Sequence, residues 1–274
     1  MARCCAVCLI AWGKMMMNDA FTAVDWQGEE ISCGNCVHRE MQAEGLCQLQ
    51  HACMFDRYAL RIDRFFQWNQ QLAKEYLRHP YFEVRAIAAK YVEVFYLAQL
   101  VNDVDETVRW SAALRLTQRQ LLLLRQDPDR EVRIRVATRL PESELKAMMH
   151  DQDYFVRTIV ARRLPQGLLP QMIHDEDREV RVEVARRVGE HVLCAMVTDP
   201  EVTVRLAVVR RLPAARLTLL LDDEDWQVRY EVAQRIDAKH LSRLLEDDDE
   251  VVRELVQQRR LVPIAQLTQQ GASL

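Results

Sequence analysis

Four cysteines in one short segment could do chemistry together. Cys33 and Cys36 are separated by two residues, and Cys47 and Cys53 complete the pattern C-x₂-C-x₁₀-C-x₅-C. Gly34, inside the first pair, permits a tight turn that points both thiolates at one centre. Four thiolates suit either a [4Fe–4S] cluster or a structural zinc ion.

The spacing of these cysteines favours an iron–sulfur cluster over zinc. Zinc ribbons usually contribute two C-x₂-C knuckles, whereas here five residues separate the second pair and one short loop joins the two pairs. His38 and His51 could substitute in a zinc site, but a complete set of four cysteines makes both histidines bystanders. The expected cofactor is therefore a [4Fe–4S] cluster held by Cys33, Cys36, Cys47 and Cys53, with zinc as the alternative.

The other cysteines give no second site. Cys4, Cys5 and Cys8 precede Met15, an alternative translation start, and three thiols without a fourth make a poor metal site. Cys194 stands alone far along the chain. Clustering of cysteines in a cytosolic chain indicates metal binding rather than a disulfide framework. We expect residues 1–30 to be a leader that is disordered or not part of the native protein.

A repeat of 24 residues must form the body that carries the cysteine segment. The pair Val-Arg recurs at that interval without an insertion, at Val84-Arg85, Val108-Arg109, Val132-Arg133, Val156-Arg157, Val180-Arg181, Val204-Arg205, Val228-Arg229 and Val252-Arg253. Asp opens seven of the units, and His79 opens the first. Each unit cannot bury an apolar face alone, so stacked units must share one core, with atypical units at the ends.

Each unit is predicted to hold two short helices. The first helix follows an Asp pair such as Asp127 and Asp129, which are good N-terminal residues. Pro then ends that helix in several units, and the shorter segment that follows suits one or two turns of α or 3₁₀ helix. The predicted domains are a cysteine module at 31–56, a linking or capping helix at 57–78, and eight repeats over 79–270, at 79–102, 103–126, 127–150, 151–174, 175–198, 199–222, 223–246 and 247–270.

The recurrent Arg is predicted to be structural. On a helical wheel with ~100° per residue, Arg133 falls within the apolar face formed by Val132, Val136, Ala137 and Leu140. A guanidinium there must be paired, because a buried unpaired charge is very costly. The Asp residues at the repeat junctions are the expected partners.

A second arginine column invites a binding role. Its members lie at the edge of the apolar face, and Arg162, Arg186 and Arg210 lie beside them on the outer face. This stripe is either a solvated face with local ion pairs or a docking strip for an acidic protein or a nucleic acid. Candidate partner-binding residues are Arg162, Arg186 and Arg210 together with the variable positions Trp110 and Tyr230.

Composition narrows the class of protein. The net charge is −4, which argues against a general nucleic-acid binder. Only 7 glycines are present, and the sequence contains no phosphate-loop, dinucleotide-binding or nucleophile-elbow motif. No apolar run reaches the ~20 residues needed to span a bilayer. The expectation is a cytoplasmic protein that does not bind membranes.

At this point the chain resembles a known family. The D-x-D-x-x-V-R-x-x-V-A-x-R-L-P repeat behind a four-cysteine module, from about Ser32 to about Leu267, is similar to the leucine-rich repeat variant proteins of nitrogen-fixing bacteria. The resemblance implies an all-α fold, a right-handed superhelical solenoid of alternating α and 3₁₀ helices. It also implies an N-terminal [4Fe–4S] cluster on Cys33, Cys36, Cys47 and Cys53.

These patterns predict an interaction scaffold rather than an enzyme, because no paired His/Cys or His/Asp motif appears in the sequence. The scaffold is expected to bind a protein partner and to use its cluster in redox sensing or electron transfer, with a link to nitrogen fixation by resemblance. The alternative is a nucleic-acid-binding solenoid with a structural metal, which would show strong salt dependence.

Overall fold

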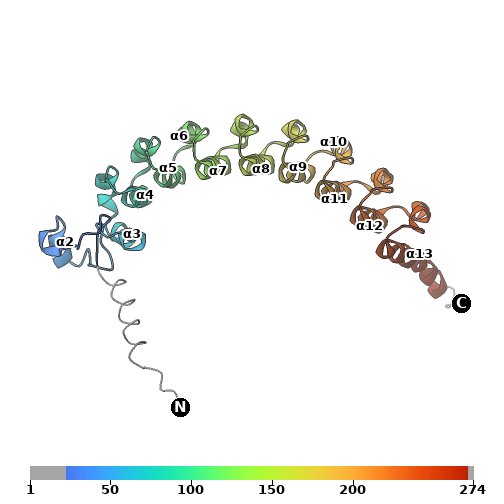
Figure 1. The fold of residues 1–274 in the computed structure, drawn as a ribbon, viewed down its shortest axis with the longest axis horizontal. Coiled ribbons are helices and arrows are strands. Elements are labelled where there is room, and N and C mark those ends of the chain that lie inside the picture. The colour runs from blue at the N-terminus through green and yellow to red at the C-terminus, as the bar shows by residue number, and fades with distance from the viewer. Residues whose placement is uncertain (1–22, 271–274) are drawn as a thin grey trace, which may run out of the picture. The chain divides into compact units, whose positions relative to one another are not determined.

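The computed structural model describes residues 23–270, with side chains up to residue 261. The predicted leader cysteines, Cys4, Cys5 and Cys8, lie outside this range. The chain divides between Arg139 and Leu140 into two compact units. Each unit is built from short α-helices that alternate with 3₁₀ helices (Figure 1). No strand occurs over residues 23–270, where extended pairing is limited to the isolated bridges Val24–Glu30 and Gln48–Ala52.

The first unit contains the cysteine module and the early repeats. Its elements, in chain order, are η1 (Cys33–Asn35), α2 (Arg39–Ala43), α3 (Ala59–Trp68), η2 (Gln70–Tyr76), α4 (Phe82–Tyr91), η3 (Val94–Leu100), α5 (Glu106–Ala113), α6 (Gln118–Leu121), η4 (Leu122–Leu124) and α7 (Arg130–Arg139).

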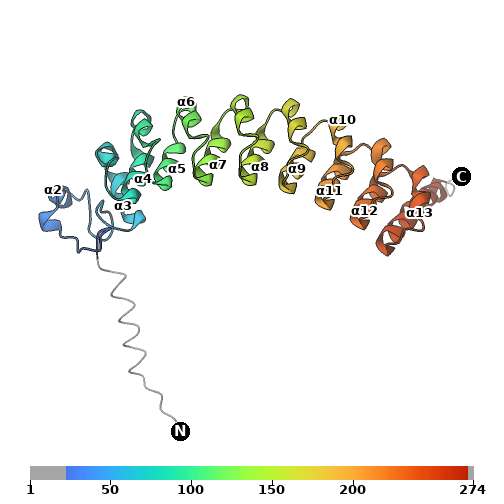
Figure 2. The same cartoon turned by 45° about the horizontal axis from the view of Figure 1, so that its top comes forward.

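The second unit continues the same alternation. Its elements are η5 (Glu142–Met148), α8 (Tyr154–Arg163), η6 (Gln166–Met172), α9 (Arg178–Ala185), α10 (Glu190–Leu193), η7 (Cys194–Met196), α11 (Val202–Arg211), η8 (Ala214–Leu220), α12 (Trp226–Arg235), η9 (Ala238–Leu244) and α13 (Glu250–Gln270). Within each unit the α-helices of successive repeats lie side by side, and the second segments form a parallel row (Figure 2). The predicted all-α fold of alternating α and 3₁₀ helices is confirmed.

The predicted apolar positions form the core. Val132, Val136, Ala137 and Leu140 have no exposed surface, and Leu145 of the following 3₁₀ segment is equally buried. Burying side chains of this size contributes about 1.5–3 kcal/mol each relative to leaving them in water. The core therefore runs between the row of α-helices and the row of second segments inside each unit.

The two Asp residues that open a repeat have different tasks. The first accepts a hydrogen bond from the backbone N–H two residues on, as in Asp175 Oδ1 from Asp177 N at 2.9 Å. The second is the helix N-cap, as in Asp225, whose carboxylate accepts from Gln227 N at 2.8 Å. A free N–H at a helix start needs such an acceptor.

Replacing Asp225 with alanine should therefore lower the free energy of unfolding by about 1 kcal/mol, because α12 would begin with one more unpaired N–H. Urea unfolding followed by circular dichroism would measure the change. Asp225→Asn keeps a side-chain acceptor and is the matched control, expected to stay close to the unchanged protein. Equal losses in both variants would contradict the capping role.

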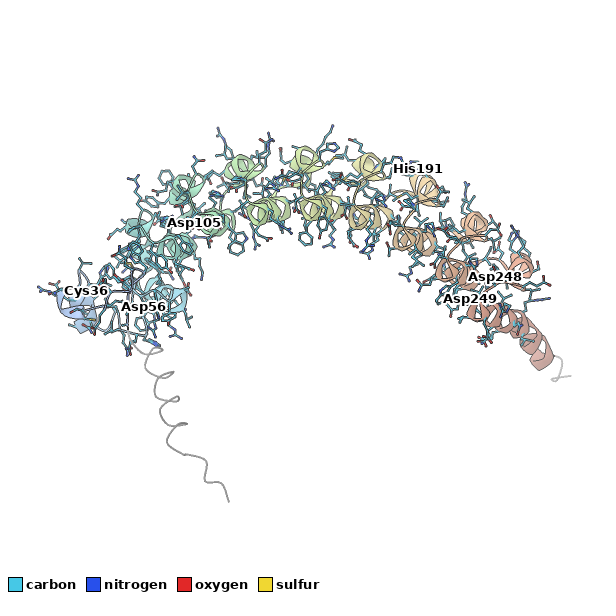
Figure 3. All side chains as sticks on the ribbon, viewed as in Figure 1. Cys36, Asp56, Asp105, His191, Asp248 and Asp249 are labelled. Atoms are coloured by element: carbon cyan, nitrogen blue, oxygen red, sulfur yellow. The ribbon has the colours of Figure 1, made fainter. Side chains whose placement is uncertain are left out.

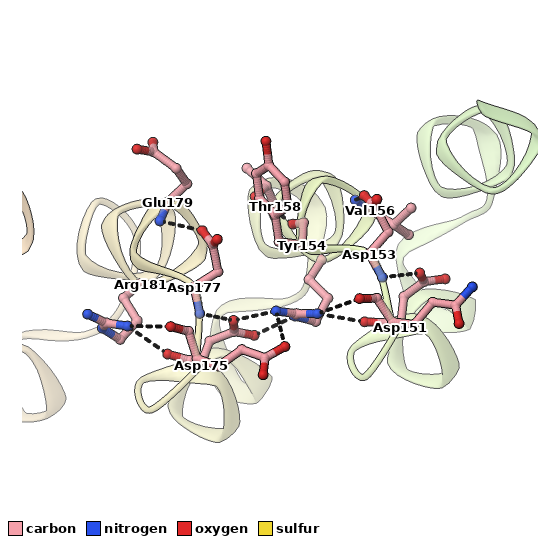
Figure 4. Close-up of polar contacts among 12 residues, drawn as sticks. Asp151, Asp153, Tyr154, Val156, Thr158, Asp175, Asp177, Glu179 and Arg181 are labelled. Carbon is pink, nitrogen blue, oxygen red and sulfur yellow. Dashed lines mark hydrogen bonds and ion pairs between the residues drawn. The ribbon is translucent and has the colours of Figure 1, made fainter. Parts of the chain in front are cut away.

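The recurrent arginines join each repeat to the next. Arg181 donates from Nε and Nη2 to the two carboxylate oxygens of Asp199 at 2.8 and 3.0 Å. Its Nη1 donates to the backbone oxygens of Asp175 and Glu176, which open its own repeat, at 2.8 and 3.2 Å. Figure 4 shows this junction around Asp175.

The same bidentate pair, 18 residues apart, recurs along both units, at Arg85–Asp103, Arg109–Asp127, Arg157–Asp175, Arg205–Asp223 and Arg229–Asp247. These arginines expose little surface, and the carboxylate beside each of Arg109, Arg157, Arg181, Arg205 and Arg229 raises the pKa of its guanidinium. The predicted burial of the recurrent Arg and its pairing with a junction Asp are confirmed.

The second arginine column ends the helices of preceding repeats. Arg139 Nη1 donates to the carbonyl oxygens of Ala113 and Leu116 at 2.7 and 2.9 Å. Arg211 makes the equivalent bonds to Ala185 and Val188 at 2.7 and 2.8 Å. The last carbonyls of an α-helix have no partner inside the helix, and a cation there is favourable. These arginines are therefore helix caps rather than a free basic strip.

The ends of the repeat array depart from the common pattern. α13 runs as one helix from Glu250 to Gln270, so the last predicted repeat contains no separate second segment among the described residues. At the other end, the segment 57–78 is not one helix, because α3 and η2 are separated at Asn69. No helix in the described part of the chain is both long and apolar enough to cross a bilayer.

Candidate iron–sulfur site

A short stretch of irregular chain positions the four cysteines. Cys33 begins the single turn of η1, and the N–H of Cys36 closes that turn by donating to Cys33 O at 3.3 Å. Gly34 was expected to be needed for this turn. Its φ is not positive, however, and a Cβ there would meet only Ser32 Oγ at 3.8 Å, so other residues would also fit.

The second pair of cysteines is positioned by two left-handed residues. Gly45, with φ +74°, ends α2 as a helix-terminating glycine, and Leu46 N donates back to Met41 O at 2.8 Å. Gln50, with φ 63°, turns the chain between Cys47 and Cys53. The N–H groups and carbonyls of the two residues flanking this turn, Gln48 and Ala52, pair at 2.9 and 2.8 Å, which returns Cys53 to the side of Cys47.

The four thiols line one small cavity. Cys33, Cys36, Cys47 and Cys53 all contribute to its wall, together with apolar residues such as Met54 and Phe65. None of the four forms a disulfide, and each is partly exposed. Figure 3 labels Cys36 in this module, with Asp56 nearby in the same part of the chain. The structure therefore brings together all four of the predicted metal ligands.

The environment of the thiols keeps them protonated in the absence of a metal. Burial raises the pKa of Cys53 to about 11, and the neighbouring Cys36 and Cys33 add to the increase. Burial also raises the pKa of Cys47, again with a contribution from Cys36 and Cys33. Four mutually repelling thiolates require positive charge at their centre, which bound metal would supply while displacing the protons. The donor set thus fits a thiolate-ligated metal centre.

The placement of the donors bears on the kind of centre. In the described part of the chain, no three His, Cys, Asp or Glu side chains are arranged to hold one metal ion. The four thiols instead surround a shared cavity. Zn–S bonds of ~2.3 Å would require the sulfur atoms to converge more closely than this.

Backbone groups approach two of the sulfur atoms. His38 N–H donates to Cys36 Sγ at 3.4 Å, and Cys47 Sγ donates to His38 O at 3.8 Å. Hydrogen bonds to cluster sulfurs are one of the features that set a reduction potential. These contacts show that the Cys36–His38 segment lies against both pairs of thiols.

His38 has a larger role than the sequence predicted. Its ring lines the cavity, its Nε2 is hydrogen-bonded to Tyr76 OH of η2, and burial lowers its pKa. It is also close to the rings of Phe55 and Phe65. The prediction that His38 is a bystander is therefore wrong for its position. His51 lies beside Trp68 and Arg64 and does not line the cavity.

Two further hydrogen bonds fasten the cysteine loops to α3 and η2. Cys53 N–H donates to Arg61 O at 3.1 Å. Asn69 is fully buried, and its Nδ2 donates to Leu46 O, next to Cys47, at 2.7 Å and to Phe65 O at 2.9 Å. Since the Asn69 side chain caps α3, it also explains why the predicted linking helix stops there.

The segment after the cysteines is an additional α/3₁₀ unit. Asp56 is buried, accepts from Tyr58 N at 3.0 Å and pairs with Arg61 at 2.8 Å, as the junction aspartates do in later repeats. α3 and η2 then match α4 and η3 in type and length. Ile62 stands at the place of the recurrent Arg, one residue out of the period, which hid this unit from the sequence search.

Residues 23–30 belong to the same body. Arg57 N donates to Val24 O at 3.2 Å, and Trp26 stacks on Tyr81 with ring centroids 5.9 Å apart and planes 9° apart. Ala23 is buried. The predicted leader over residues 1–30 therefore does not extend through 23–30. The aromatic spacing of Trp26 alone could not have indicated this contact.

The candidate partner-binding residues do not form one site. Arg162 and Arg186 both pair with Glu183, at 3.1 and 2.6 Å, and Arg210 pairs with Glu231 at 2.8 Å. Trp110 is half-buried under the guanidinium of Arg135. Tyr230 is half-buried on α12.

Comparison with known proteins agrees with this geometry. Residues 23–75 match the family described as "LRV protein FeS4 cluster", and residues 154–177 match "Leucine rich repeat variant". A curated protein of Rhodobacter capsulatus, "Uncharacterized 27.7 kDa protein in nifB 3'region", is 47% identical over 93 residues. That match covers 34% of this chain and 38% of the relative, so it spans little more than a third of the relative's length.

A solved structure extends the likeness over the repeats. The structure titled "A leucine-rich repeat variant with a novel repetitive protein structural motif" is 42% identical to this chain, with a TM-score of 0.79. The match covers 82% of this chain and 97% of that protein. With both the repeats and the iron–sulfur module matched, the chain belongs to the leucine-rich repeat variant family.

Proposed function

We propose that this protein is a helical-repeat scaffold that carries a [4Fe–4S] cluster and binds a protein partner, with the cluster acting in redox sensing or electron transfer. The observation that carries the proposal is the convergence of Cys33, Cys36, Cys47 and Cys53 on one cavity that is hydrogen-bonded to the adjoining α/3₁₀ unit. The family match to an FeS4-cluster module supports it. When bound, such a cluster supplies a one-electron donor and acceptor.

The residues of this chain would each contribute to holding the cluster. The four thiolates would be its ligands, and His38 N–H would donate to the sulfur of Cys36. His38 and Asn69 would fix the loops by their bonds to Tyr76 OH and Leu46 O. A rigid ligand shell limits the rearrangement that accompanies electron transfer, and hydrogen bonds to the sulfurs tune the potential.

The link to nitrogen fixation is part of the proposal. It is supported by the printed name of the Rhodobacter capsulatus relative, which places that protein in the nifB 3' region. The alternative of nucleic-acid binding needs a continuous basic face. Its candidate arginines, Arg162, Arg186 and Arg210, lie against Glu183 and Glu231, and this pairing reduces the positive potential that a phosphate backbone would meet.

Anaerobic purification with metal and sulfide analysis tests the proposal. We expect about four irons and four sulfides per chain, broad absorbance near about 400 nm, and a paramagnetic signal that appears on reduction, as for a [4Fe–4S] centre. A midpoint potential that shifts on binding a protein partner would support the redox role. Stoichiometric zinc without iron would contradict the cluster.

A further inference from the structure

One face of the first unit carries an arginine without an acidic partner. The Cζ atom of Arg135, on α7, lies 4.6 Å from the centroid of the Trp110 ring, on the neighbouring helix α5. Its Nε is buried and has no hydrogen-bond partner in the described part of the chain. No carboxylate there forms an ion pair with its guanidinium. The stacked ring therefore holds the fork of Arg135 in place without neutralising it.

The repeat register shows that this charge replaces an acidic residue. Arg135 is the ninth residue of its repeat, and the ninth residues of two later repeats are Glu183 and Glu231. Each of these carboxylates accepts from arginines on the same face of the second unit. Repeat 3 thus has a cation at the position that elsewhere supplies the neutralising anion.

A second cation lies one turn further along α7. Arg139 spends its Nη1 donors on the carbonyl oxygens of Ala113 and Leu116, which carry no net charge. Its pKa is lowered by burial and then by the positive charge of Arg135. Like charges four residues apart destabilise a helix by about 0.2–0.5 kcal/mol. A bound anion would remove this repulsion.

We propose that Trp110 and Arg135, with Arg139 beside them, form a docking site for an acidic segment of a protein partner. A carboxylate matches the planar guanidinium fork, and the indole keeps that fork pre-oriented. Tryptophan and arginine are the residue types that most often dominate protein–protein binding energy. The inference rests on the proposed partner-binding function and specifies the chemistry of the partner. Trp110 was among the candidates from sequence, whereas Arg135 was not.

The test uses the full chain with its metal and a fluorescein-labelled acetyl-hexaglutamate peptide, with binding followed by fluorescence anisotropy at low salt. Arg135→Gln is expected to weaken binding about tenfold or more, because it removes a charge-assisted hydrogen-bond donor. Arg119→Gln removes an exposed arginine of α6 in the same unit and should change affinity less than about twofold. Equal affinities for all three proteins would overturn the site.

Hydrogen exchange of the unaltered protein removes any dependence on how a variant folds. Adding the hexaglutamate peptide should slow amide exchange in α5 and α7, and protection confined to other helices would overturn the proposal. So would the absence of any binding, or tighter binding of an oligothymidine of equal charge, which would indicate a nucleic-acid surface. Iron content and the paramagnetic signal are measured on the same sample, so failure of this site is distinguishable from failure of the proposed function.

Discussion

Replacing Arg157 with alanine is expected to lower the free energy of unfolding by about 3–5 kcal/mol, the cost of removing one partner from a buried ion pair. Arg157 is 5% exposed and donates to both carboxylate oxygens of Asp175, at 2.9 and 3.0 Å. It also donates to the carbonyl oxygens of Asp151 and Gln152, at 2.8 and 3.4 Å. Truncation would leave the buried Asp175 carboxylate and these carbonyls without their donor.

Urea unfolding, monitored by circular dichroism, would measure the effect. Arg178→Ala is the matched control in the same unit, because Arg178 is more than half exposed and its ion pairs are long, at 3.6 and 3.8 Å. It should cost less than about 1 kcal/mol. Arg157→Lys keeps the charge but not the bidentate fork, so an intermediate loss is expected. An Arg157→Ala protein as stable as the control would show that the recurrent arginines are not structural.

Replacing Cys47 with serine is expected to abolish iron binding and to loosen the N-terminal α/3₁₀ unit. The residue before it, Leu46, is held by Asn69, and Cys53 N–H is bonded to Arg61 O, so the metal ligands and α3–η2 share one hydrogen-bond network. Without a metal, four thiols whose pKa values are raised by burial and by each other have no common centre to hold them.

Iron analysis, absorbance near about 400 nm and hydrogen exchange would follow the two consequences. Amides of α3 and η2 should exchange at least about tenfold faster, whereas those of α11 and α12 in the second unit should not change. Cys194→Ser is the control, since Cys194 begins η7, in a different part of the sequence from the cysteine module. Full iron content in Cys47→Ser would rule out this residue as a required ligand.

The repeats were predictable from sequence because one physical constraint acts at every junction. A buried guanidinium needs a carboxylate, and the fixed interval between them makes both residues recur at 24 residues. The α-helix starts, the buried Val positions and the role of the recurrent Arg followed from that pattern. The pattern fails where the constraint lapses: Ile62 replaces the Arg in the unit formed by α3 and η2, and the period slips by one residue.

The ligand set was predictable, but its support was not. Thiols at short spacings announce a metal centre by their chemistry alone. The contacts of His38 with Tyr76 and of Asn69 with Leu46 join residues 38 and 23 positions apart. Their partners are set by how the cysteine loops pack on α3 and η2, which no local pattern encodes. The same holds for the stacking of Arg135 on Trp110, which depends on the facing of two helices from different repeats.

The 18-residue reach of each Arg–Asp pair has a consequence for how such a protein can change length. Excising 24 residues within a unit would bring an equivalent Arg to an equivalent Asp, since each pair spans only one boundary. A deletion of one residue would instead misalign the donors and acceptors on both sides of the change. Genes for such chains can therefore grow or shrink by whole modules through unequal recombination, while smaller insertions and deletions are removed by selection against unpaired buried charge.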